Sequence, residues 1–257
     1  MIIKLIEMLG KFSLFNLGQI GSIAIFAGNS IKNCFVAPFY FKIILKKFLQ
    51  IGYYSLPVVG LTAIFSGAVL ALQSYSGFSR FNAESTIATV VVLSIARELG
   101  PVLAGLMVAG RVGASIAAEI GTMKVTEQID ALKTLSTNPF KYLVAPRVWA
   151  CVITMPILVL IADIIGVLGG YLVSVYVLGF SPGNYIINSF KFLEKIDVVL
   201  GLVKAGVFGL IIAIISCYFG YNSKGGAEGV GVATTNAVVC SSIIILLSNY
   251  IITGLFF

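Results

Sequence analysis

The sequence contains no histidine and few charged residues of either sign. Among its 257 residues, Lys, Arg, Asp and Glu together make up 11%, whereas soluble domains contain about 25%. Without histidine, the chain cannot form a His-based catalytic triad, a zinc site of the H-E-x-x-H type or an imidazole proton relay. The composition therefore excludes a large part of hydrolytic and metal-dependent chemistry.

Two further absences narrow the functional classes. The four cysteines are scattered along the chain and lack the spacing of a disulfide framework or a metal site. No G-x-x-x-x-G-K-[ST] motif occurs, so an ATP-driven process would need a separate ATPase chain. We expect no metal, no cofactor and no catalytic residue in this chain.

Long uncharged stretches are the main feature that the sequence does have. Hydrophobic residues make up 59% of the chain, and about 20 apolar residues suffice to cross the ~30 Å hydrocarbon core of a membrane. Five stretches with at most two charges each meet this requirement: Ile51–Leu72, Thr86–Gly110, Val148–Val177, Val198–Tyr218 and Gly229–Phe257. The sequence predicts an all-α integral membrane protein with five transmembrane helices and its termini on opposite sides.

The distribution of Lys and Arg predicts the orientation, because basic loops near span ends stay in the cytoplasm. With the N-terminus inside, twelve of the 17 Lys and Arg residues lie on the cytoplasmic side and three on the other. The remaining two, Arg97 and Lys204, lie within spans. We therefore expect a cytoplasmic N-terminus and a periplasmic C-terminus, and we attribute the net charge of +7 to topology and not to nucleic-acid binding.

Residues 1–47 form an N-terminal segment distinct from the membrane domain at 48–257. The segment is apolar but interrupted by seven charged residues, a spacing that favours a position in the membrane interface. Four glycines are expected to prevent a single long helix here: Gly10, Gly18, Gly21 and Gly28. The alternative is a sixth span over Leu14–Ile31, which is uncharged but rich in Gly, Asn and Ser.

Small residues recur every four positions in and beyond the second span. They form two neighbouring rows, which are Gly105, Ala109, Gly113 and Ala117, and beside them Gly110, Ala114 and Ala118. Small side chains let helix backbones approach closely, which is how helices associate in lipid. The spacing does not decide whether the neighbouring helix belongs to this chain or to a second copy, and packing within the chain is favoured.

Charged residues inside the predicted spans indicate a functional site, since a charge at the bilayer centre costs at least ~2.5 kcal/mol. Arg97 and Glu98 are adjacent, so on a helix they point about 100° apart. We expect Glu98 to meet Lys204, and Arg97 to face a polar cavity or an anionic headgroup. The alternative is a buried structural ion-pair network. Asp163 stands alone in its span, and we expect packing contacts to satisfy it as a structural residue.

A polar stretch at Glu119–Leu132 separates the second and third spans on the predicted cytoplasmic side. Thr126 is expected to cap the N-terminus of a water-exposed helix, with Glu127 and Asp130 in its first turn. Three residues form a narrow apolar stripe on this helix: Ile129, Leu132 and Leu135. Such a helix suits docking to the membrane or to a partner protein, and a solvated connector is an equally good interpretation of the pattern alone.

Three blocks of sequence closely resemble the MlaE/YrbE family of ABC-transporter permeases. They are ARELGPVLAGLMVAGRVGAS at 96–115, the polar stretch at 119–132, and PRVWA at 146–150. The resemblance extends from about Ile51 to Tyr250, so residues 48–257 are interpreted as an MlaE-like permease domain. Members of this family are membrane subunits of lipid transporters that work with MCE-domain proteins, and they have an N-terminal interfacial helix and five spans.

The resemblance implies a homodimer of permeases that encloses a lipid cavity open to the periplasm of a bacterial inner membrane. Two cytoplasmic ATPase subunits would bind ATP and Mg, an MCE-domain periplasmic protein would exchange phospholipid, and a small cytoplasmic accessory subunit is a further partner. The polar stretch would be the coupling helix that docks into the ATPase, through Glu119, Lys124, Thr126, Glu127, Asp130 and Leu132. The substrate pathway is expected to include Leu70 and Gln73 besides Arg97, Glu98 and Lys204.

The C-terminal part departs from the family pattern at three positions. The family commonly has Arg at the positions of Val232 and Asn236, and Asp at that of Asn249. Contacts made by these charges in relatives therefore cannot be transferred to this chain.

A secondary carrier coupled to ions or protons is the alternative function from another class. It would use Glu98, Asp163 and Lys204 as relay groups. Its transport would stop when the proton gradient collapses and would be unaffected by the removal of ATP.

Overall fold

The computed structural model describes residues 2–81 and 86–256, and every regular element in these ranges is a helix. In chain order the elements are α1 (Ile2–Cys34), α2 (Phe41–Gly52), η1 (Tyr53–Ser55), α3 (Leu56–Phe78), η2 (Ser79–Phe81), α4 (Ile87–Ser94), η4 (Ile95–Leu99), α5 (Gly100–Val108), η5 (Ala109–Gly113), α6 (Ala114–Val125), α7 (Gln128–Thr134), η6 (Phe140–Val144), α8 (Ala145–Tyr176), α9 (Pro182–Lys191), α10 (Lys195–Tyr221) and α11 (Gly226–Phe256). The elements η4, η5 and η6 are π-helical turns within longer helices. The predicted all-α class is confirmed.

Within the described ranges, five helices are long and apolar enough to cross a membrane. They are α2–α3 (Phe41–Phe78), α4–α6 (Ile87–Val125), η6–α8 (Phe140–Tyr176), α10 and α11. The five predicted spans are confirmed, although Phe257, the end of the fifth, lies outside the described residues. The helix from Ile87 to Val125 has 39 residues and is about 58 Å long, so it extends well beyond the ~30 Å hydrocarbon core.

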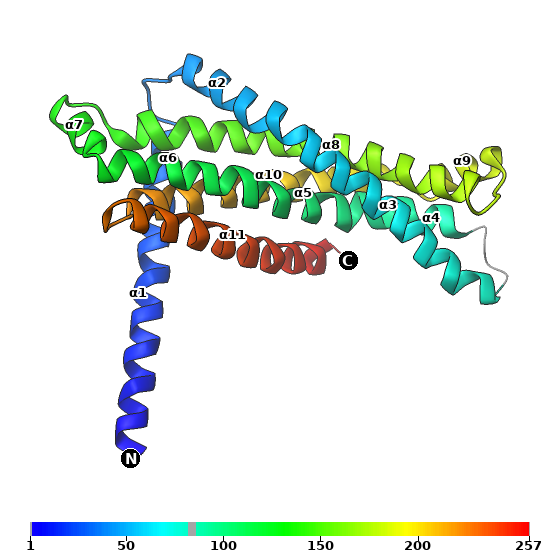
Figure 1. Ribbon diagram of the computed structural model, residues 1–257, viewed down its shortest axis with the longest axis horizontal. Helices are drawn as coiled ribbons and strands as arrows, with labels where there is room; N and C mark the ends of the chain where they lie inside the picture. Colours follow the sequence, from blue (N-terminus) through cyan, green and yellow to red (C-terminus); the bar gives the residue numbers. More distant parts are fainter. Residues whose placement is uncertain (1, 82–85, 257) are drawn as a thin grey trace.

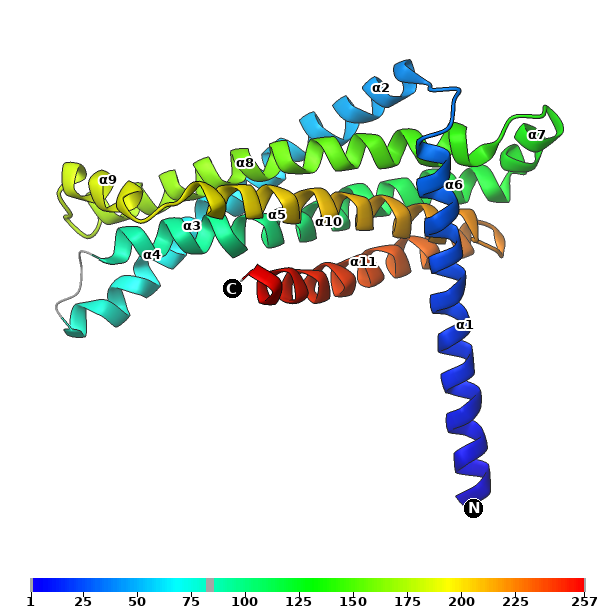
Figure 2. The same ribbon diagram turned by 180° about the vertical axis from the view of Figure 1, so that it is seen from behind.

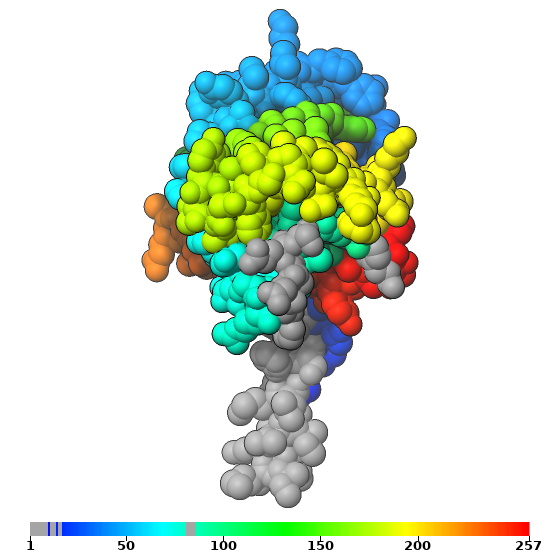
Figure 3. All heavy atoms as spheres, turned by 90° about the vertical axis from the view of Figure 1, so that its right-hand side faces the viewer, coloured from blue at the N-terminus to red at the C-terminus, as the bar shows by residue number. Residues whose placement is uncertain are grey.

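The five long helices lie roughly along one axis, and α1 runs across them (Figure 1 and Figure 2). One end of the bundle carries α7 and the first turns of α2, and the opposite end carries α9 (Figure 1). We call these the α7 end and the α9 end. Figure 3 views the α9 end, where α9 in yellow-green and the start of α10 in yellow cover the bundle.

α1 is held to the α7 end by its C-terminal half. The ring of Phe26 lies 5.1 Å from that of Phe140 and 5.6 Å from that of Tyr218, measured between centroids. Trp149 Nε1 donates a hydrogen bond to the carbonyl oxygen of Cys34 at 3.1 Å. α1 crosses the five long helices and is not aligned with them (Figure 1), which disfavours a sixth span, and its interfacial position stays a prediction.

The predicted break of α1 at its glycines was wrong. α1 is one helix of 33 residues. A glycine inside a helix costs only about 1 kcal/mol relative to alanine, and aromatic contacts at the α7 end add stability that sequence propensity does not include. Glycine content alone therefore did not predict where this helix ends.

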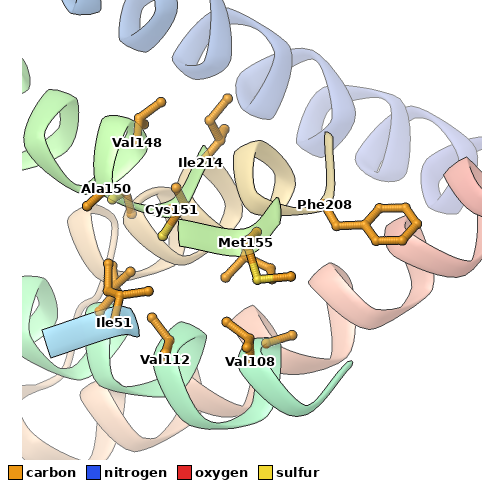
Figure 4. Close-up of a cluster of buried hydrophobic side chains, with 14 of the residues drawn as sticks. Ile51, Val108, Val112, Val148, Ala150, Cys151, Met155, Phe208 and Ile214 are labelled. Carbon is orange, nitrogen blue, oxygen red and sulfur yellow. The ribbon is translucent and has the colours of Figure 1, made fainter. Parts of the chain in front are cut away.

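The bundle core is a cluster of buried apolar side chains between α5–α6, α8 and α10. Figure 4 shows Met155 and Cys151 of α8 between Phe208 of α10 and Val108 and Val112 of the second span. The first row of small residues faces this core. A Cβ at Gly105 would lie 3.2 Å from Phe208, and one at Gly113 would lie 3.0 Å from Ser216. The favoured interpretation of this row, packing within the chain, is confirmed.

α3 and α8 approach each other through glycines. A Cβ built at Gly67 would lie 1.9 Å from the carbonyl oxygen of Gly166, and one at Gly169 would lie 2.2 Å from that of Ile64. No real Cβ can take these positions, so the two backbones touch where other residues would hold them apart. We call these contacts the glycine seam.

Candidate functional site

A polar cluster forms where the second span contains a π-helical turn. η4 (Ile95–Leu99) carries Arg97 and Glu98 and is followed by Pro101. Proline has no N–H, so in an α-helical register the carbonyl four residues back, that of Arg97, loses its donor. Lys204 Nζ of α10 donates to this carbonyl at 2.9 Å. The break in the helix thus creates an acceptor that the buried lysine binds.

Glu98 and Lys204 form the ion pair predicted from the sequence. Their closest atoms, Lys204 Nζ and Glu98 Oε1, are 2.8 Å apart. Thr253 donates to Glu98 Oε1 at 2.9 Å, and Asn249 Nδ2 donates to Glu98 Oε2 at 2.8 Å. The Lys204 side chain is only 2% exposed, so its charge requires these oxygens. The predicted pairing of Glu98 with Lys204 is confirmed, and these groups form a network that joins the second, fourth and fifth spans.

Arg97 differs from the expectation, because it pairs with a carboxylate of α10. Its Nη2 lies 2.7 Å from Asp197 Oδ1, and its Nε donates to the same oxygen at 2.7 Å. Asp197 is fully buried, and its other oxygen accepts from the backbone N–H of Glu194 at 3.0 Å. The Arg97 side chain is still 33% exposed. A guanidinium that is bound to a buried carboxylate and partly exposed can contact a further anion.

The sequence analysis missed Asp197 as a partner of Arg97. The signal was weak: an acid at the third helical position after Glu194 resembles an ordinary first-turn acid at the start of a helix. Its burial against a residue 100 positions earlier is visible only in the folded chain.

The other two residues expected on the substrate pathway, Leu70 and Gln73, lie one helical turn apart on α3 and differ in burial. Leu70 is partly buried against an apolar cluster that includes Ile95, two residues before Arg97. Gln73 is exposed near the end of the helix. The structure therefore places Leu70 beside the π-helical turn and Gln73 at the surface.

The expectation that packing contacts satisfy Asp163 was wrong. Among the described residues, its buried Oδ1 has no hydrogen-bond partner. A Cβ added at Gly100 would lie 1.8 Å from this oxygen, so the carboxyl group is pressed against the helix directly after η4. Asp163 thus lies behind the turn that carries Arg97 and Glu98, on the side of α8.

A second polar cluster lies at the α7 end around Glu119. Lys47 Nζ is 2.6 Å from Glu119 Oε2, and Arg147 Nη2 is 2.9 Å from the same oxygen. Arg147 is 2% exposed and also donates to the carbonyl of Leu143 at 2.5 Å. The sequence analysis assigned Glu119 to a water-exposed helix, whereas α6 continues through it and its carboxylate joins three long helices.

The connection between α6 and α7 also differs from the single helix that was expected. α6 ends at Val125, and Thr126 is the residue that ends it and not an N-cap of α7. Its hydroxyl donates to the carbonyl of Thr122 at 2.8 Å. Glu127 precedes α7 with φ of 59°, a left-handed conformation that turns the chain sharply. The polar stretch is therefore a helix–turn–helix, because a residue in this conformation interrupts helical hydrogen bonding.

α7 packs against the chain by one face and exposes the other. Ile129 is fully buried and Leu132 is partly buried against the core, whereas Leu135 is 74% exposed. Asp130 lies 2.9 Å from both Lys133 and Lys124, and these two lysines hold the pKa of its carboxyl group below its usual range. The stripe seen in the sequence is thus mainly an internal anchor, and the surface left for a partner is formed by the charged face and Leu135.

The positions that depart from the family pattern fall into two places. Val232 and Asn236 line a cavity of about 580 Å³ between α1, the end of α10 and α11. Asn249 lies in the polar cluster, where it binds Glu98. Its Oδ1 is buried and has no hydrogen-bond partner among the described residues.

These features define a class of protein. The chain is a multi-pass helical membrane protein whose charged residues are paired between spans. Its residues match the family described as Permease MlaE from 44 to 255, and the chain belongs to this family of ABC transporter permeases. It is therefore a transporter subunit and not itself an enzyme.

Several proteins are similar to this chain over most of its length. A probable ABC transporter permease protein of Rickettsia bellii is 66% identical over 255 residues, which are 99% of this chain and 94% of the relative. The intermembrane phospholipid transport system permease protein MlaE of Haemophilus influenzae is 37% identical over 221 residues, 85% of this chain and 84% of the relative. The chloroplastic protein TRIGALACTOSYLDIACYLGLYCEROL 1 of Arabidopsis thaliana is 36% identical over 236 residues, 92% of this chain and 67% of the relative.

Proposed function

We propose that the chain is the permease subunit of a transporter that moves phospholipid, or a related lipid, between a bacterial inner membrane and a periplasmic MCE-type carrier. The similarity to a phospholipid transport permease supports a lipid substrate. The observation that carries the proposal is the position of Arg97 within a span, where its guanidinium binds buried Asp197 while its side chain stays 33% exposed. A phosphate group is the natural further ligand of such a guanidinium.

The assembly in this proposal is a homodimer with separate ATPase subunits. This chain has no P-loop, so ATP and Mg are bound by the cytoplasmic ATPase. The α7 end faces the cytoplasm and the α9 end faces the periplasm, as the lysine and arginine distribution predicts. In this arrangement the coupling segment, with Lys124, Glu127, Asp130 and Leu132, meets the ATPase, while Glu119 transmits its movement to α2 and α8. A small accessory subunit completes the cytoplasmic side.

The substrate pathway in this proposal follows the polar cluster. Arg97 holds the phosphate of the lipid, and the Glu98–Lys204 pair keeps three spans in register around it. Leu70, and Gln73 toward the α9 end, contact the rest of the lipid. The secondary-carrier alternative has less support, because Glu98 and Lys204 bind each other whereas Asp163 lies against Gly100.

Lipid content of the purified transporter tests the role of Arg97. Arg97→Ala alone leaves Asp197 buried and unpaired, which costs about 3–5 kcal/mol and confuses a binding defect with misfolding. The double variant Arg97→Ala/Asp197→Ala removes both charges and should fold. We expect it to retain less than about a tenth of the phospholipid found by mass spectrometry with the wild type, because it lacks a charge-assisted hydrogen bond.

The matched control is Arg80→Ala, which removes an exposed arginine of η2, directly after α3, and should leave the lipid content unchanged. If the double variant carries normal lipid and transports it at the normal rate, Arg97 is a structural residue only. Transport that stops with the proton gradient and continues without ATP would favour the carrier alternative.

A further inference from the structure

A second cavity with charged walls lies near the α7 end, away from Arg97. Its volume is about 260 Å³, and it lies between α2–η1 and η5–α6. The lining residues are Lys47, Gln50, Ile51, Arg111, Val112, Ser115, Ile116 and Glu119. Arg111 is 14 residues beyond Arg97 on the same long helix, a distance of about 21 Å. The cavity is therefore distinct from the polar cluster at η4.

Basic side chains outnumber acidic ones at this cavity. Lys47 and Arg147 share one carboxylate, that of Glu119, at 2.6 and 2.9 Å. Arg111 Nη1 donates to the neutral Ser55 Oγ at 2.8 Å, and none of the ion pairs formed by the described side chains includes Arg111. Among the lining residues, Lys47 and Arg111 are positive and Glu119 is negative, so the cavity lining carries an excess of one positive charge, and Arg147 contacts the same carboxylate from outside the lining.

The arrangement of these groups follows from two antiparallel helices. Lys47 opposes Glu119 at one end of the cavity, and Ser55 opposes Arg111 at the other. Eight residues separate the two levels on each helix, which is about 12 Å. η5, the second π-helical turn of the span, carries Arg111. The cavity is thus an elongated space with a cation at each end.

The wall between these ends is apolar. Ile51 of α2 and Val112 and Ile116 of the second span line the cavity together with the polar groups. Cations beside apolar side chains suit a ligand that has both an anionic group and hydrocarbon. At the end of a membrane helix, the ligand with this chemistry is a lipid headgroup.

We propose that this cavity binds the phosphodiester of a membrane lipid through Arg111. It is a second headgroup site, at the opposite end of the span from Arg97. This inference rests on the proposed transport of lipid and adds a place where a lipid is held near the α7 end. A free phosphate ion has the same anionic group and is the competing source of the ligand.

Native mass spectrometry of the full-length chain, with the subunits that purify with it, tests the site. The probes are dioleoylphosphatidylglycerol, dioleoylglycerol with the same acyl chains but no phosphate, and inorganic phosphate. We expect Arg111→Gln to weaken phosphatidylglycerol binding at one site about tenfold and to leave dioleoylglycerol binding unchanged. Lys42→Gln, which removes an exposed charge of α2 that does not line the cavity, is the control and should bind like the wild type.

Two further measurements keep the outcome clear. Ser115→Asp places a negative charge on the cavity wall and should abolish the same binding phase even if Arg111→Gln does not fold. If inorganic phosphate alone displaces the lipid, the anion site is assigned to free phosphate. If it does not, the site is assigned to the lipid headgroup. Wild-type lipid binding in both cavity variants overturns the proposal.

The two lipid sites are separable in this experiment. The Arg97→Ala/Asp197→Ala variant should lose the binding phase that depends on η4 and keep the one that depends on Arg111. If Arg111→Gln and Ser115→Asp keep wild-type binding while the double variant loses its phase, the second site fails and the proposed function stands. If the double variant binds like the wild type while the cavity variants lose a phase, the proposed role of Arg97 fails and the second site stands.

Discussion

Single glycines set how closely the first and third spans approach. Gly67 and Gly169 each place their Cα hydrogen against a backbone carbonyl of the facing helix. Such a contact cannot be relieved by a rotamer change, because the atom that would clash belongs to the backbone. One added methyl group at the glycine seam should therefore change the packing of α3 against α8 and destabilise the bundle.

Gly67→Ala is expected to destabilise the protein by about 1–3 kcal/mol, since its Cβ must push α3 away from α8. Thermal unfolding of the purified chain in detergent measures this change. Gly77→Ala in the same helix is the control, because its Cβ meets nothing within 4 Å. Equal unfolding temperatures for the two variants would contradict the close contact at Gly67.

Residue pairing could be predicted from the sequence only where both charges stand out. Glu98 and Lys204 carry opposite charges and lie in stretches that are otherwise almost entirely apolar. Each of them needs a partner in the membrane. Asp197 stands among charged residues at the start of its helix, so nothing in the sequence marks it as buried. The acceptor that binds Lys204, the Arg97 carbonyl, is a backbone atom and is invisible to side-chain patterns.

At the scale of elements, the segment between the second and third spans combines an anchored face with an exposed one. Ile129 fixes α7 to the core, and the left-handed residue Glu127 fixes the angle between α6 and α7. Asp130 is held by two lysines of its own segment. Charge reversal at Asp130 would therefore disturb α7 itself and would not test docking cleanly.

Glu127→Lys is the better test of the coupling segment. Its side chain is exposed, so reversal of its charge should leave the fold intact and weaken ATPase association about tenfold or more. Copurification of the ATPase with the tagged permease measures the effect. Glu127→Gly is the control, because glycine adopts the left-handed conformation of this turn without strain. It should retain more ATPase association than Glu127→Lys. Full association of Glu127→Lys would remove this residue from the interface.

The existence of each element was easier to predict than its ends. Uncharged stretches mark the part of a helix that contacts hydrocarbon, and the first three spans continue past it at the α7 end. The continuation carries charges such as Glu119 that resemble a loop in the sequence. These charges are satisfied by neighbouring helices, Lys47 and Arg147 in this case, and only the packed structure reveals this.

At the scale of the whole molecule, the two ends of the bundle differ in charge and in structure. The α7 end carries α1, α7 and the Glu119 cluster, and the α9 end carries a short exposed helix with Asn184 on its surface. The basic side chains are concentrated at the first of these ends. This asymmetry is what predicts the orientation of the protein in the membrane.

Cysteine labelling in intact cells checks that orientation. We expect Asn184→Cys to react with a membrane-impermeant maleimide before lysis and Ser136→Cys, placed after α7, to react only after lysis. The native background is low, since Cys34, Cys151 and Cys217 are buried and Cys240 is half-buried within α11. The reverse labelling pattern would invert the proposed topology.

The glycine seam has a mechanical consequence. Side chains at a helix interface can exchange rotamers and let two helices slide, but backbone contacts at Gly67 and Gly169 contain no such adjustable parts. Tightly packed interfaces behave as bistable and not as continuously deformable. α3 and α8 should therefore move as one rigid body, so that any rearrangement during a transport cycle is confined to the seams where side chains, and not backbones, meet.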